Sequence, residues 1–236
     1  MLEKITQLFL QKSLLDVSTE ECMEMLQLDL QMFTEARETI RQREDNHVNI
    51  DIYKYDKKVN KLERSVRKKI FTHLAVGSRL DLNRGLILIN IVIDLERIGD
   101  YTKNMVELAK ARHEPLNPGP WKKKIDQIET DIVKSFKTLI ELFSTSDPDK
   151  ETAREIMSNL NEYNKVFDDN MVEIIRGQVK KLSPSDAATL VLYMRYLKRI
   201  GCHLKNVASS IVNPMHRIGF KPKKEKSRIR TKTIKT

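Results

Sequence analysis

The stretch DLERIGDYTKN, residues 94–104, is repeated 102 positions later as YLKRIGCHLKN, residues 196–206. Six of the eleven positions are identical, namely Leu, Arg, Ile, Gly, Lys and Asn. Asp81 and Ser183, which we interpret as caps at two helix starts, are separated by the same 102 positions. A segment duplicated at this spacing predicts two similar halves, each with the segment in its third long helix.

The composition of the chain favours long helices. Its 236 residues include only 7 Gly and 7 Pro, and no Pro precedes Pro115. Apolar residues at steps of three and four predict three long helices in each half. Helix starts are expected at Ser18 with Glu21, at Asp147 with Pro148, and at Ser183 with Pro184. We therefore predict an all-α fold of two tandem three-helix bundles related by internal duplication, which excludes a strand-rich sandwich or barrel.

The densest group of helix breakers, EPLNPGP at residues 114–120, divides the chain as a linker. The first bundle is predicted to occupy residues 1–113, beginning with a short amphipathic helix at residues 2–15, and the second to occupy residues 121–212. Residues 213–236 carry nine Lys or Arg and one Glu without an apolar period. We predict that this last segment is a basic, disordered tail.

Charge and cysteine content point to the cytoplasm. The net charge of +10 is concentrated in the tail, because residues 1–212 carry 34 basic and 32 acidic groups. Cys22 and Cys202 are too few for a disulfide framework. The most apolar run, residues 86–93, is too short to span a bilayer, which needs about 20 residues. We expect a cytoplasmic protein, and a peripheral location at the inner face of the membrane stays open.

Two carboxylates stand one helical turn apart in the first copy of the repeat. Glu96 and Asp100 are at i and i+4, so both project to the same side of the helix. Such a pair needs a cation nearby, which is either a metal ion or the side chains of Arg97 and Lys103. Spacing alone favours the ordinary ion pairs. The same helix presents a separate core stripe that comprises Leu88, Val92, Leu95, Gly99 and Val106.

The preceding helix offers more oxygen ligands. Asp56, Asn60 and Glu63 are at i, i+4 and i+7. If the two helices are antiparallel neighbours, these oxygens would complete a site with Glu96 and Asp100. Carboxylates alone suit magnesium, manganese or iron.

The LERIGD stretch at Leu95–Asp100 resembles the signature of the PhoU family of phosphate-signalling regulators and matches it at all six positions. The Asp-x-x-Val-Asn run at Asp56–Asn60, the Asp81-Leu82 pair, the length and the duplication also fit. The resemblance covers roughly residues 18–212. It implies two similar three-helix bundles lying side by side.

The resemblance also implies a non-enzymatic regulator of cellular phosphate homeostasis. Such a cytoplasmic adaptor represses phosphate uptake and phosphate-starvation signalling. Its implied partners are a sensor histidine kinase and the ATPase of a phosphate ABC transporter, or another phosphate carrier. We also expect a homodimer.

In the family, ExxxD motifs bind metal ions or small clusters, and Glu96 and Asp100 match that motif here. The second copy departs from it, because Lys198 and Cys202 replace the two carboxylates. We therefore predict one metal site, in the first bundle only, with Glu96, Asp100, Asp56 and Glu63 as ligands. The ion would be iron, zinc, manganese or magnesium.

Other functions have weaker support in the sequence. No Ser-His-Asp order, Gly-rich phosphate loop or His-rich motif indicates an enzyme, and no catalytic residue is predicted. His73 lies on an apolar stripe and is predicted to be a core histidine. The alternative function is a metal-binding helical bundle that binds nucleic acid or an anionic membrane through residues 213–236. Nucleic acid is the less favoured of the two, because the tail has no aromatic residue beyond Phe220 and no known motif.

Overall fold

The computed structural model describes residues 13–45, 47–76, 81–179 and 182–221. Within these ranges the chain forms six long α-helices and no β-strand. The helices are α2 (Leu14–Gln42), α3 (Ile52–Val76), α4 (Leu82–Lys110), α5 (Lys122–Phe143), α6 (Lys150–Ile175) and α7 (Pro184–Val212). The predicted all-α architecture, with three long helices on each side of a linker, is confirmed.

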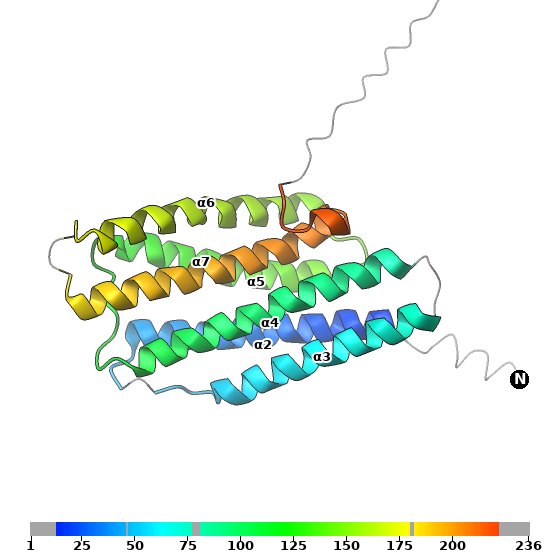
Figure 1. Ribbon diagram of the computed structural model, residues 1–236, viewed down its shortest axis with the longest axis horizontal. Coiled ribbons are helices and arrows are strands. Elements are labelled where there is room, and N and C mark those ends of the chain that lie inside the picture. Colours follow the sequence, from blue (N-terminus) through cyan, green and yellow to red (C-terminus); the bar gives the residue numbers. More distant parts are fainter. Residues whose placement is uncertain (1–12, 46, 77–80, 180–181, 222–236) are drawn as a thin grey trace, which may run out of the picture.

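The helices form two groups of three that lie side by side (Figure 1). α2, α3 and α4 pack against one another in the first bundle, and α7 packs with α6 and α5 in the second. The bundles meet where α4 lies against α7 and where α2 lies against α5. α3 and α6 consequently occupy opposite outer edges of the molecule.

The start of α2 differs from the prediction at Ser18. Ser13 caps this helix, because its hydroxyl oxygen accepts a hydrogen bond from the backbone N–H of Asp16 at 3.1 Å. Ser18 lies inside the helix and donates to the carbonyl of Leu14. The earlier start buries Leu15. Of the predicted short helix at residues 2–15, only 13–15 are described; residues 14–15 belong to α2.

The caps of the second bundle are partly as predicted. Ser183 caps α7 and Pro184 is its first residue, which confirms that prediction. Asp149, not Asp147, caps α6, because its carboxylate accepts hydrogen bonds from two backbone N–H groups of the first turn. The prediction at Asp147 is therefore wrong by two residues.

The segment directly after α7 is ordered up to residue 221, so the predicted disorder is wrong for residues 213–221. A short 3-10 helix, Met215–Arg217, follows α7. The Asn213 side-chain amide donates to the carbonyls of Arg217 and Phe220 at 3.1 and 2.7 Å. These side-chain bonds tie the segment to Asn213, the residue at the C-terminal end of α7. The rest of the predicted tail lies outside the described residues.

The linker packs against the first bundle. Leu116 is 2% exposed, and its N–H donates to the carbonyl of Ile40 at 2.8 Å. The linker ends in a 3-10 turn, Gly119–Trp121. The predicted core stripe of α4 is buried at all five of its positions, which are Leu88, Val92, Leu95, Gly99 and Val106.

The pattern of buried positions is repeated in the two halves and shows which residues of one half correspond to which residues of the other. Six buried positions of α2 have buried counterparts in α5. They are 22, 25, 29, 32, 33 and 36, which correspond to 125, 128, 132, 135, 136 and 139. Positions 52, 59, 66 and 70 of α3 recur at 153, 160, 167 and 171 of α6. Phe33 and its counterpart Phe136 contact each other, with ring centroids 5.9 Å apart. In this register, Asp29 of the first bundle corresponds to Ile132 of the second.

Candidate functional site

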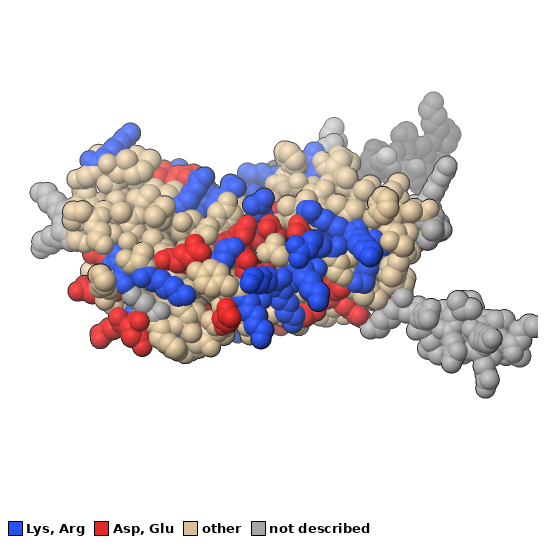
Figure 2. Space-filling view, turned by 60° about the horizontal axis from the view of Figure 1, so that its bottom comes forward, with Lys and Arg blue, Asp and Glu red and all other residues tan. Residues whose placement is uncertain are grey.

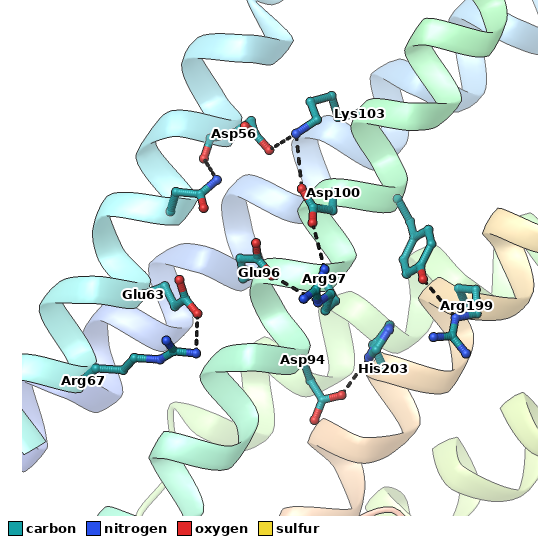
Figure 3. Close-up of polar contacts among 12 residues, drawn as sticks. Asp56, Glu63, Arg67, Asp94, Glu96, Arg97, Asp100, Lys103, Arg199 and His203 are labelled. Carbon is teal, nitrogen blue, oxygen red and sulfur yellow. Dashed lines mark hydrogen bonds and ion pairs between the residues drawn. The ribbon is translucent and has the colours of Figure 1, made fainter.

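The predicted acidic residues lie on the neighbouring helices α3 and α4 (Figure 3). Lys103 lies between two of them, with its Nζ atom 2.9 Å from Asp56 Oδ1 and 3.2 Å from Asp100 Oδ1. Burial lowers the pKa of Lys103, but the hydrogen bonds to the two carboxylates outweigh it and the pKa is raised. The ammonium group therefore stays charged and bridges α3 and α4.

The other two predicted ligands pair with arginines. Arg97 Nε lies 3.5 Å from Glu96 Oε2, and the Glu63 carboxylate lies 2.7 Å from Arg67 NH2. The Arg97 side chain is 54% exposed, so its pairing contributes little. The Asn60 amide donates to the carbonyl of Asp56 within its own helix.

The structure therefore brings Asp56 and Asp100 together around Lys103. Arg97 lies near both Glu96 and Asp100, and Glu63 has its own partner in Arg67. Within the described part of the chain, no three His, Cys, Asp or Glu side chains are placed to hold one metal ion. As arranged, these residues do not form a metal-binding set. The carboxylates form ion pairs with Arg97 and Lys103, and this is the alternative to a metal site that their spacing in the sequence favoured. The metal site stays a prediction.

A carboxylate that sequence reasoning missed lies beneath this cluster. Asp29 of α2 is 0% exposed, and neither of its oxygens has a hydrogen-bond partner among the residues that the structure describes. Burial raises the pKa of Asp29 well above its usual value, and the charges of Glu96 and Asp56 raise it further. The signal that identifies Asp29 is its core position, where the second half has Ile132.

Gly99 allows α4 to approach this buried carboxylate closely. A Cβ atom at Gly99 would lie 3.1 Å from Asp29 Oδ1. The equivalent Cβ at Gly201 would lie 3.7 Å from Leu160, an ordinary contact. Tight packing therefore favours glycine at Gly99, whereas the equivalent position in the second bundle has room for a Cβ atom.

Negative charge exceeds positive charge at the cluster. Burial, and next the charge of Asp100, raise the pKa of Glu96, while Arg97 partly opposes them. Five carboxyl groups face three cationic side chains, which are those of Arg67, Arg97 and Lys103. A proton or a cation bound at the cluster would offset this excess of negative charge.

The second bundle has no equivalent carboxylate pair. Lys198 forms an ion pair with Asp168 of α6. The Cys202 thiol donates to Asn164 Oδ1 at 3.3 Å. Cys202 is a partly buried free cysteine, as the sequence favoured.

The repeated segments meet at the contact between α4 and α7. Asp94 Oδ1 lies 2.7 Å from His203 Nδ1 and accepts a hydrogen bond from the Asn206 amide at 2.9 Å. Arg199 Nε donates to the Tyr101 hydroxyl at 3.1 Å, and the Tyr101 ring stacks on His203. His203 therefore faces α4, away from the α6 partner of Cys202, so the two adjacent residues do not act together.

His73 is not a fully buried core histidine. Its side chain is 17% exposed, and Nε2 lies 2.9 Å from Asp81 Oδ2. This pair lies at the end of α3, where Asp81 precedes α4 without forming a side-chain cap. The predicted core position is thus corrected to a paired position at the edge of the bundle.

The Lys103→Met variant is expected to bind a divalent cation such as Mn²⁺ about tenfold more tightly than the wild type. The reason is that the ion no longer competes with the ammonium between Asp56 and Asp100. Calorimetric titration of the full chain measures the change. Lys205→Met, at the equivalent position of the second repeat, is the matched control and should not alter binding. Unchanged Mn²⁺ affinity in Lys103→Met would contradict the predicted site.

No helix in the described ranges is both long enough and apolar enough to cross a membrane.

Comparisons with known proteins agree with this architecture. The PhoU domain family matches the chain twice, over residues 22–109 and 125–211, which correspond to the two bundles. The chain is similar in fold to the crystal structure of PhoU from Pseudomonas aeruginosa, with a TM-score of 0.74 and 19% identity. That similarity covers 84% of this chain and 95% of the other. No curated protein sequence matches the chain. Because the family match covers both bundles, and so most of the sequence, the chain belongs to the PhoU family.

Proposed function

We propose that this protein is a non-enzymatic regulator of cellular phosphate homeostasis that acts as a cytoplasmic adaptor. Membership of the PhoU family supports a regulator of phosphate homeostasis in general. The observation that carries the proposal is the match of both bundles to the PhoU domain. The finer role is repression of phosphate uptake and of phosphate-starvation signalling.

The adaptor works by reversible contact with other proteins. Its partners are a sensor histidine kinase and the ATPase of a phosphate ABC transporter, or another phosphate carrier, and it forms a homodimer. The polar contacts of Asp94 with His203 and Asn206 support a fixed arrangement of the two bundles, so that a partner can engage both. The proposal does not depend on a metal ion at the acidic cluster. Binding of nucleic acid through the tail has no support in the described residues.

Crosslinking and capture of the tagged full chain from its native cells test the proposal. We expect recovery of a sensor kinase or transporter ATPase, in amounts that change between phosphate-rich and phosphate-poor media. Recovery of nucleic acid, or of no membrane partner in either medium, would contradict the adaptor role.

A pair of double variants shows whether the acidic cluster takes part in partner binding. Glu96→Gln with Asp100→Asn neutralises the cluster, and Lys198→Gln with Cys202→Ser changes the equivalent positions of the second repeat. If the cluster contributes, only the first variant loses the captured partner. Equal capture by both variants would leave the adaptor role intact and remove the cluster from it.

A further inference from the structure

The two edge helices carry opposite charge although they occupy equivalent places in the fold. α3 contains eight Lys or Arg residues and two Asp or Glu residues, whereas α6 contains three Lys or Arg residues and six Asp or Glu residues. All four buried positions of α3 recur as buried positions of α6 in the register of the duplication. The packing of the bundle therefore does not require the charge of α3, and the excess of lysines lies on its outward side.

Five of the α3 cations have no ion pair or hydrogen bond within the described part of the chain. Each of the other three pairs with an acidic residue, as in the contact of Lys58 with Glu24 and that of Lys69 with Glu21. The unpaired set is exposed to solvent. We call it the basic face of α3, and it comprises Lys54, Lys57, Lys61, Arg64 and Lys68.

The basic face is a straight stripe along one side of the helix. At 100° per residue its members fall within one quarter of the helix circumference, and from residue 54 to residue 68 they extend over about 21 Å. Phe71 continues the stripe at one end and is 73% exposed. Figure 2, which turns this side of the molecule forward, shows Lys and Arg gathered over the middle of that surface.

We propose that the basic face of α3 binds an anionic lipid surface. Four of its five cations are lysines, which are flexible point charges suited to a diffuse negative potential and lack the planar fork that reads bases or single phosphates. The face belongs to an edge helix whose apolar side is already buried against α2 and α4. The helix would therefore lie flat on a membrane surface and bind it through its charged side chains. An exposed aromatic ring beside lysines is a typical interfacial anchor. This inference goes beyond the proposed function, because it holds whichever protein partner is bound.

Vesicle binding of the full chain tests the proposal. The wild type is expected to bind vesicles that contain phosphatidylglycerol and not vesicles of phosphatidylcholine alone, and added salt should weaken the binding. Each lysine near an anionic surface contributes about a fivefold change in partition. The Lys57→Gln, Lys61→Gln, Lys68→Gln variant should therefore bind about 100-fold more weakly. Glutamine retains helix propensity, and circular dichroism checks the fold.

A matched control removes the same charge elsewhere. Lys123→Gln, Lys134→Gln and Lys137→Gln neutralise three exposed lysines of α5, on another side of the molecule. This variant should keep nearly all of the vesicle binding. Equal loss in both variants would overturn the proposal, since net charge alone would then explain binding. Binding that survives in the α3 variant, or binding of the basic face to duplex DNA in place of vesicles, would also overturn it.

The depth of contact is tested at Phe71. The chain has a single Trp, Trp121, so a Phe71→Trp, Trp121→Phe variant reports from the end of the basic face alone. Its fluorescence should shift to the blue on addition of phosphatidylglycerol vesicles, because the indole enters the interface. An emission spectrum unchanged by vesicles that bind the protein would mean that another surface makes the contact.

Discussion

At neutral pH the Asp29→Asn variant is expected to be more stable than the wild type, by about 2–4 kcal/mol in the free energy of unfolding. Asp29 is fully buried without a hydrogen-bond partner, and neighbouring Glu96 and Asp56 repel its charge. An amide keeps the shape of the side chain and removes its ionisation. Urea denaturation of both proteins across a range of pH measures the difference.

The pH dependence has a definite sign. Because the pKa of Asp29 is raised in the folded state, the folded protein holds this proton more tightly than the unfolded chain does. Its contribution to stability is complete below the unfolded pKa of about 3.9 and is lost as the pH rises toward the folded pKa. The gain from Asp29→Asn should therefore be close to zero at acid pH and should grow toward neutral pH.

Asp100→Asn serves as the control, because that carboxylate already pairs with Lys103 and its neutralisation should bring no gain. A fall in stability of Asp29→Asn at neutral pH would contradict the prediction. If a chelator destabilised the wild type in the same experiment, the negative charge of Asp29 would be balanced by a bound cation and not removed by protonation.

The Glu129→Ala variant is expected to lose about 3–5 kcal/mol of unfolding free energy. The Tyr193 hydroxyl donates to Glu129 Oε1 at 2.7 Å, and Arg41 Nε lies 3.1 Å from the same oxygen. Tyr193 is 0% exposed, so removal of the carboxylate leaves its buried hydroxyl without a hydrogen-bond acceptor. The Arg41 side chain, 8% exposed, loses one of its two carboxylate partners and keeps Asp126. The three residues come from α5, α7 and α2, and the loss should weaken the contact between the bundles.

Chemical denaturation compares Glu129→Ala with Glu141→Ala, which removes an exposed glutamate from the same helix. The control should change stability by no more than about 0.5 kcal/mol. Glu129→Gln keeps a hydrogen-bond acceptor and should fall between the two. Equal stability of the two alanine variants would mean that the buried network does not hold α2, α5 and α7 together.

Much of the fold could be predicted because its signals are local or repeated. The steps of apolar residues in α4 placed its core stripe correctly, and the Ser183-Pro184 pair placed the start of α7. Helix ends were predicted less well where two capping residues compete. Ser13 replaces Ser18 and Asp149 replaces Asp147, and in each case the side chain of the residue used accepts a hydrogen bond from a backbone N–H of the first turn.

The six helices, the duplication and the positions of Glu96 and Asp100 on one side of a helix could be predicted from the sequence, because periodicity and spacing encode these features directly. The family resemblance came from the LERIGD motif at Leu95–Asp100. The packing of the helices was needed to show that Lys103 lies between Asp56 and Asp100. It also showed that, among the described residues, Asp29 is buried without a hydrogen-bond partner and the basic face of α3 has no paired acidic side chain. Partners of a charged side chain lie on other helices, and their distance and burial depend on how those helices pack rather than on their separation in the chain.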